Sequence, residues 1–125
     1  MTARASLARA KDPGGVATVG PRRLAEDRLL LSDLDLALGD AQAAHREAGV
    51  ALRLFRMAKD AEGQCRGHVR RAHALIELKR AGEAAREARR ALRAAPLTRT
   101  HLRVLAEIAL GRALLRTERG QARLA

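Results

Sequence analysis

The chain has 125 residues, enough for one domain but too few for a second full-size core. Hydrophobic residues make up 47% of it, yet most of these are alanine and leucine, with one phenylalanine and no tryptophan or tyrosine. Alanine buries little surface at about 25 cal/mol per Å², so a core must be spread along closely packed helices. Alanine, leucine, arginine and glutamate are strong helix formers. The composition therefore predicts an all-α fold.

The formal net charge of +11 favours an anionic partner, and all but three of the 25 basic residues are arginines. Two interpretations stay open: a functional positive surface, or a coding bias that enriches arginine on a solvated surface. Cys65 is the only cysteine, which excludes an intramolecular disulfide. No stretch approaches the ~18 apolar residues of a membrane helix. We therefore expect a cytoplasmic protein without a membrane partner.

The first residues of the chain differ from the rest. Asp12-Pro13-Gly14-Gly15 interrupts any early helix, and Gly20-Pro21 interrupts the chain again. We expect residues 1–21 to form a flexible basic arm and residues 22–125 to form one helical domain.

Five helices are expected in that domain, separated by turn and breaker residues. The first begins at Arg22 and ends at Gly39, and it carries Leu24, Leu31, Leu34 and Leu38 on one face. The second begins at Ala41, and the third covers residues 61–80. The fourth follows a turn at Ala81-Gly82 and ends at Pro96. The fifth runs from Thr98 to Thr117, before a turn at Gly120.

An internal repeat with a period of about forty underlies these helices. Residues 45–53 align with residues 85–93 in this repeat, and six of the nine positions are identical. A third copy begins at a shift of about 39, which pairs Ala74-Leu75 with Ala113-Leu114. The residues that end the helices recur at the same positions of each repeat. The repeat is therefore expected to be a structural unit and not only a result of the alanine- and arginine-rich composition.

The second copy resembles the tetratricopeptide repeat. In that family, small residues recur at fixed positions so that neighbouring helices can approach closely, and a proline closes the unit. The matching residues are Ala72, Ala84, Ala91, Leu92 and Pro96 in the second copy, and Ser32, Ala44, Ala51 and Leu52 in the first. The first copy has Arg56 at the proline position and the family's aromatic residues are missing. The period is closer to the longer repeats of MalT-like bacterial regulators.

This resemblance implies antiparallel helix-pair repeats stacked as a short right-handed α-solenoid, with two repeats and an incomplete third. It also implies a scaffold for protein–protein interaction, in a setting such as bacterial signalling or transcription control. The first helix of each pair would line a groove that binds a protein or peptide, and arginines there favour an acidic partner. The expected groove residues are exposed polar positions: Arg28, Asp35, Arg66, Arg70, His73, Glu77 and Arg103.

The fifth helix is apolar around most of its circumference, whereas the end of a repeat array needs a polar outer face. Three alternatives remain: a partner or second copy covers it, the array continues, or the helix packs back on the preceding pair. The expected contact residues are Leu102, Leu105, Ile108, Leu114 and Leu115.

Catalytic and metal chemistry find little support. Cys65 and His68 lie about 60° apart on a helix, but His73 lies about 140° from His68, so the three do not converge on one ion. No phosphate-binding glycine loop follows Gly14-Gly15. We therefore expect no enzyme activity, no cofactor and no metal. The main alternative function is nonspecific nucleic-acid binding by two arginine strips: Arg86, Arg89, Arg90 and Arg93, and Arg66, Arg70, Arg71 and Arg80.

Overall fold

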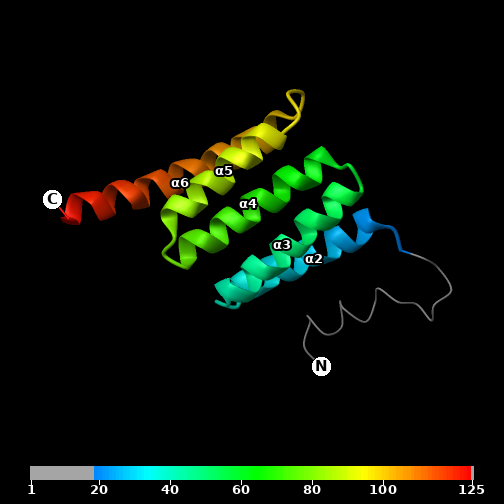
Figure 1. Ribbon diagram of the computed structural model, residues 1–125, viewed down its shortest axis with the longest axis horizontal. Coiled ribbons are helices and arrows are strands. Elements are labelled where there is room, and N and C mark those ends of the chain that lie inside the picture. The colour runs from blue at the N-terminus through cyan, green and yellow to red at the C-terminus, as the bar shows by residue number, and fades with distance from the viewer. Residues whose placement is uncertain (1–18, 125) are drawn as a thin grey trace.

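The computed structural model describes residues 19–124, so most of the expected basic arm lies outside the described residues. The described part folds into five α-helices and contains no strand (Figure 1). The helices are α2 (Pro21–Ala37), α3 (Ala41–Met57), α4 (Ala61–Glu77), α5 (Ala81–Ala94) and α6 (Thr100–Leu124). This confirms the all-helical prediction. None of these helices is long and apolar enough to cross a membrane.

The first three helix connections are built in the same way. After α2, Gly39 has a φ of 84°, its amide donates to the Leu36 carbonyl, and the Asp40 amide donates to the Asp35 carbonyl. This pair of bonds defines a Schellman turn, which satisfies carbonyls at a helix end. Equivalent bonds follow α3 and α4, where Lys59 and Lys79 have φ values of 54° and 64°. The same turn therefore recurs at even spacing along the chain.

Side chains cap the helices that follow two of these turns. The Asp40 carboxylate accepts from the Ala43 amide, and the Asp60 carboxylate accepts from the Gly63 amide, each at 3.0 Å. Such caps satisfy a free amide at the helix N-terminus. The caps begin α3 and α4 where the sequence predicts.

Two predicted boundaries are wrong. The third turn lies at Lys79 instead of Ala81-Gly82, because the hydrogen bonds of the turn offset the cost of placing a lysine in the left-handed region. The chain also does not turn at Gly120, since α6 continues to Leu124. A single glycine inside a helix costs only about 1 kcal/mol relative to alanine, which strong helix formers on both sides can offset.

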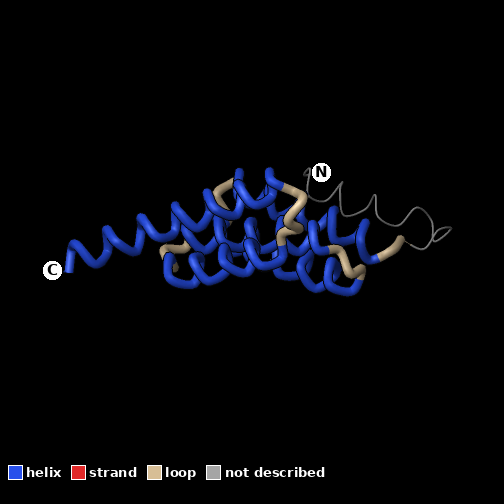
Figure 2. The backbone as a smooth tube through the Cα atoms, turned by 90° about the horizontal axis from the view of Figure 1, so that it is seen from above, coloured by secondary structure: helices blue, strands red, loops and turns tan. Residues whose placement is uncertain are grey.

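Consecutive helices pack side by side, and α4 also contacts both α2 and α6, whereas no Cα atom of α3 lies within 8 Å of one in α5. The helices α2, α4 and α6 therefore form one layer, and α3 and α5 cover it at separate places. The C-terminal part of α6 extends beyond the other helices (Figure 2).

Small side chains form much of the core between these layers. Ala88 and Ala91 of α5 pack with Val69 and Ala72 of α4, and all four are at most 2% exposed. Between α3 and α4, the Cα of Gly63 faces the ring of buried Phe55 so closely that a Cβ would lie 2.1 Å from its Cδ1. The predicted stripe of α2 is wrong at Leu38, which is 73% exposed because it is the C-cap residue and lies past the last helical turn.

Candidate binding groove

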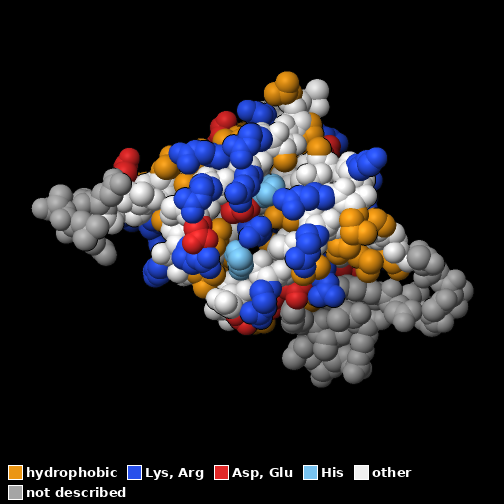
Figure 3. Space-filling model, viewed as in Figure 1, with side chains coloured by type: hydrophobic (Ala, Val, Ile, Leu, Met, Phe, Trp, Pro, Cys, Tyr) orange, Lys and Arg blue, Asp and Glu red, His pale blue; other side chains and the backbone are white. Residues whose placement is uncertain are grey.

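A groove opens along α3, on the side where no Cα atom of α5 comes within 8 Å of α3; its lining residues all lie on α3, except for one on α4. It contains a cavity of about 470 Å³. Four arginines and a histidine line this cavity together with small and aliphatic residues, and no carboxylate does. We call this surface the arginine groove, and its lining residues are His45, Arg46, Gly49, Val50, Leu52, Arg53, Arg56 and Arg71. Figure 3 shows Lys and Arg side chains gathered over this face of the molecule.

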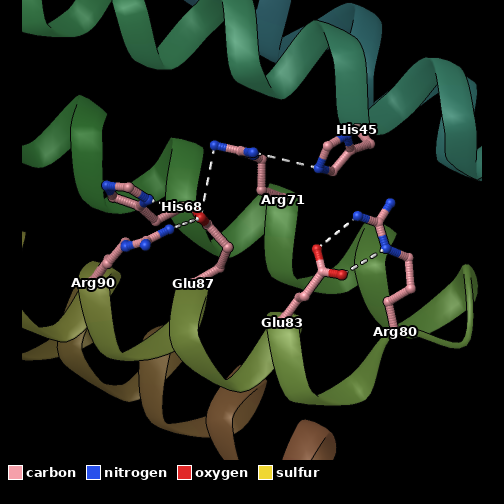
Figure 4. A network of polar contacts seen from close by, with 7 residues as sticks. All are labelled: His45, His68, Arg71, Arg80, Glu83, Glu87 and Arg90. Carbon is pink, nitrogen blue, oxygen red and sulfur yellow. Dashed lines mark hydrogen bonds and ion pairs between the residues drawn. The ribbon is translucent and has the colours of Figure 1, made fainter.

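Arg71 projects from α4 into the space between α3 and α5 (Figure 4). Its Nη1 lies 3.6 Å from Oε1 of Glu87 on α5, and its Nη2 lies 3.5 Å from Nε2 of His45 on α3. Its Nε is buried and has no hydrogen-bond partner among the described residues. An unsatisfied buried donor costs about 1–3 kcal/mol. Arg71 therefore has one unsatisfied donor inside the fold, while its terminal nitrogens contact Glu87 and His45.

Glu87 is the acid of α5 that contacts Arg71, and its side chain is only 3% exposed. Burial alone would raise its pKa, but a hydrogen bond from His68 at 2.8 Å and the positive charges of Arg71 and Arg90 outweigh this and lower the pKa to about 2. Glu87 is therefore ionised at neutral pH and already surrounded by cations. It holds the side chains at the base of the groove in place and leaves the outer arginines uncompensated.

His45 contributes no charge to the groove near neutral pH. Burial lowers its pKa below 6.5, and the nearby positive charges of Arg71 and Arg80 lower it further. A neutral His45 can accept or donate a hydrogen bond. The positive charge of the groove therefore comes from arginines, whose charge does not vary with physiological pH.

The internal repeat places matching arginines on α3 and α5, of which only those on α3 line the cavity. Arg46 and Arg53 on α3 correspond to Arg86 and Arg93 on α5, and all four are exposed. From the sequence, the α5 arginines predict a phosphate-binding strip on the fourth helix alone. The groove along α3 is not predicted, because the sequence does not reveal that α3 and α5 stay apart.

The predicted groove on the first helices is only partly assembled. Arg66, Arg70, His73 and Glu77 share one face of α4, but Arg70 pairs with Asp33 of α2. Arg112 of α6 contacts His73 and Glu77. These contacts within the chain connect α2, α4 and α6. They also pair several of the charged groups that were predicted to bind a partner.

The other three predicted groove residues lie elsewhere. The Arg28 guanidinium pairs with Glu47 of α3 at 3.1 Å, and Arg103 donates to the Leu92 carbonyl of α5 at 3.5 Å, so both reach toward second helices. The prediction that Asp35 is exposed is wrong, because it is 4% exposed. It shares the face of α2 that carries Leu29 and Ser32 and that packs on α3.

The predicted apolar end of the fifth helix divides into two faces. Leu102 was expected to be available to a partner, and this is wrong, because it is 3% exposed and packs in the core with residues of α4 and α5. The helix packs back on the preceding pair through this face. Leu105, Ile108, Leu114 and Leu115 remain exposed, at 38–52%.

The residues considered for metal chemistry point to different neighbours. The Cys65 thiol contacts the Leu102 carbonyl at 3.8 Å, while His68 Nδ1 contacts Glu87. Over the described part of the chain, no three His, Cys, Asp or Glu side chains gather in a way that could hold a metal ion. Burial also raises the pKa of the Cys65 thiol, which opposes formation of a nucleophilic thiolate.

Comparison with known proteins finds no family model, no curated protein and no solved structure that matches the chain. The chemistry of the arginine groove must therefore be inferred from its own side chains.

Proposed function

We propose that this protein is an interaction module built as a tetratricopeptide-like array, in which α2–α3 and α4–α5 are two repeats and α6 is the first helix of a third. The even recurrence of the same turn, at Gly39, Lys59 and Lys79, supports this proposal. So does the correspondence of Arg28–Glu47 with His68–Glu87, two helix-bridging pairs at equivalent positions of the two repeats. In this arrangement the helix pairs stack as a short right-handed α-solenoid.

The ligand we propose is an acidic segment of a partner protein, bound in the arginine groove. The observation that carries this proposal is the lining of the cavity, which contains four arginines and no carboxylate. An arginine fork can bind a carboxylate through two parallel hydrogen bonds. Aspartate or glutamate side chains spaced along an extended or helical segment would therefore satisfy the groove.

Nucleic acid is the second candidate, since the same arginines could contact phosphates. Single-stranded nucleic acids are usually held by stacking of bases on aromatic side chains. The single aromatic residue of the chain, Phe55, is 0% exposed and packs in the core. Any such binding would depend on charge alone, and a partner with carboxylates fits the groove better.

Binding of matched polyanions tests the proposal. The full chain is titrated, by fluorescence anisotropy at about 0.15 M salt, with a labelled glutamate-rich peptide and with a single-stranded oligonucleotide of equal charge. We expect the peptide to bind more tightly. Tighter binding of the oligonucleotide, without sequence preference, would support the second candidate instead.

Two arginine variants locate the site. Arg53→Glu places an acid in the groove, and we expect it to weaken peptide binding about tenfold. Arg66→Glu is the matched control on the opposite layer, because it makes the same charge change on α4 outside the groove. An effect of Arg66→Glu equal to or larger than that of Arg53→Glu would move the site to the first helices or show that only net charge matters.

A further inference from the structure

The exposed face of α6 carries a continuous apolar stripe. Val104, Ile108 and Leu115 are 45%, 52% and 52% exposed, and Gly111 lies in line between them. At 100° per residue, this stripe is opposite the buried one, which consists of Leu102, Ala106, Ala109 and Ala113. The side of α6 that faces away from α4 and α5 is therefore as apolar as the side that packs on them.

The repeat shows what kind of neighbour this stripe fits. Gly63 and Gly67 of α4 face α3, because an added Cβ would meet Phe55 and Leu52 there. Their counterparts at a shift of 39 are Leu102 and Ala106, which pack toward α5. The same shift therefore relates corresponding faces of α4 and α6.

At this register, three exposed positions of the α6 stripe match buried positions in both earlier repeats. The stripe residues Val104, Ile108 and Gly111 correspond to Cys65, Val69 and Ala72 of α4, which pack against alanines of α5. In α2 the corresponding residues are Ala25, Leu29 and Ser32, which pack against α3. In both earlier repeats, a second helix covers the face that α6 leaves open.

One charge distinguishes the open position from the two that are covered. Arg28 of α2 pairs with Glu47 of α3, and His68 of α4 pairs with Glu87 of α5. The corresponding residue of α6 is Glu107, which is exposed and forms no ion pair with any residue over 19–120. A covering helix with glutamate at the Glu47 position would therefore repel α6, and a helix with arginine or lysine there would pair with it.

We infer that α6 binds a helix of another polypeptide, which carries alanines or other small residues at the positions of Ala44, Ala48 and Ala51 and a basic residue at the position of Glu47. In sequence terms, two small residues lie seven positions apart, and a third lies four positions after the first of them. The basic residue directly precedes this middle small residue. The helices α3 and α5 carry glutamate at this position and already cover α2 and α4, so neither of them is the occupant in a second copy. The inference does not depend on the arginine groove.

Two peptides of identical composition test the inference. Both cover residues 80–97; one carries Glu87→Arg and the other carries Glu83→Arg, so they differ only in where the arginine lies. We expect the Glu87→Arg peptide to bind the full chain about tenfold more tightly, measured by titration calorimetry. The chain variant Glu107→Arg should reverse this preference. Comparing the ratio of affinities between the two chains cancels any difference in helicity between the peptides.

Two further variants test the apolar contact. Ile108→Asp should weaken binding of the preferred peptide at least tenfold, whereas Leu97→Asp, at a position that is 84% exposed in the loop before α6, should leave it unchanged. The inference is overturned if neither peptide binds, or if the ratio of the two peptide affinities is the same for the natural and Glu107→Arg chains. It is also overturned if sedimentation shows that the natural chain is a dimer and that Ile108→Asp makes it a monomer.

Discussion

The close contact between Gly63 and Phe55 allows a quantitative test of the packing of α4 on α3. Gly63→Ala would place a Cβ 2.1, 2.4 and 2.5 Å from three carbons of the Phe55 ring. The ring is 0% exposed and shares a core cluster with Ala25, Leu29 and Ala51, so it has little room to move. Overpacking of this kind costs about 1–3 kcal/mol.

The matched control is Gly49→Ala, also inside a helix, where nothing lies within 4 Å of an added Cβ. Replacing glycine by alanine in a helix is worth about 1 kcal/mol in both variants. Gly49→Ala should therefore be about 1 kcal/mol more stable than the natural chain, and Gly63→Ala about 2 kcal/mol less stable, since its contacts are so short. The expected difference between the two variants is about 3 kcal/mol.

Urea denaturation followed by circular dichroism measures both free energies of unfolding. A second background separates the steric effect from any change in helix propensity: in a Phe55→Leu chain, the ring is gone and Gly63→Ala should cost much less. Such non-additivity is expected between residues in contact. Equal stability of Gly63→Ala and Gly49→Ala, or additive effects of Gly63→Ala and Phe55→Leu, would refute the close helix contact.

Three further predictions concern single side chains. The folded pKa of Glu87 is lowered from 4.5 to about 2, so its contribution to stability is present above pH 4.5 and is lost as the pH falls toward 2. We expect the carboxyl carbon of Glu87 to titrate near pH 2 by NMR. A titration midpoint at pH 4.5 or above would contradict the buried network. Asp40→Ala removes the bond to the Ala43 amide and should lower the free energy of unfolding by about 1 kcal/mol in the same urea assay, and an unchanged midpoint would show that the cap contributes nothing. The Cys65 thiol is 0% exposed and burial raises its pKa, so a thiol reagent at neutral pH should react with it only as fast as the chain opens; rapid labelling of the folded chain would show that α4 and α6 are not closely packed there.

The sequence alone predicts the helical class and most of the helix boundaries, because these depend on local interactions. Composition favours helices throughout, Pro96 lacks the amide that a helix interior needs, and Asp40 and Asp60 cap the helices that follow them. The turn at Lys79 was misplaced because a lysine with positive φ carries no sequence signal of its own. Gly82, the residue that does carry such a signal, lies inside α5.

Only the tertiary structure decides which face of each helix is available. Asp35 and Leu102 were expected to be exposed but are buried, because the packing of neighbouring helices determines which side chains lose contact with water. Arg71 reaches between α3 and α5 only because these helices stay apart. In a chain rich in alanine and arginine, several faces of a helix are almost equally apolar, so the sequence predicts the repeat while the packing of the repeats determines the surface that binds.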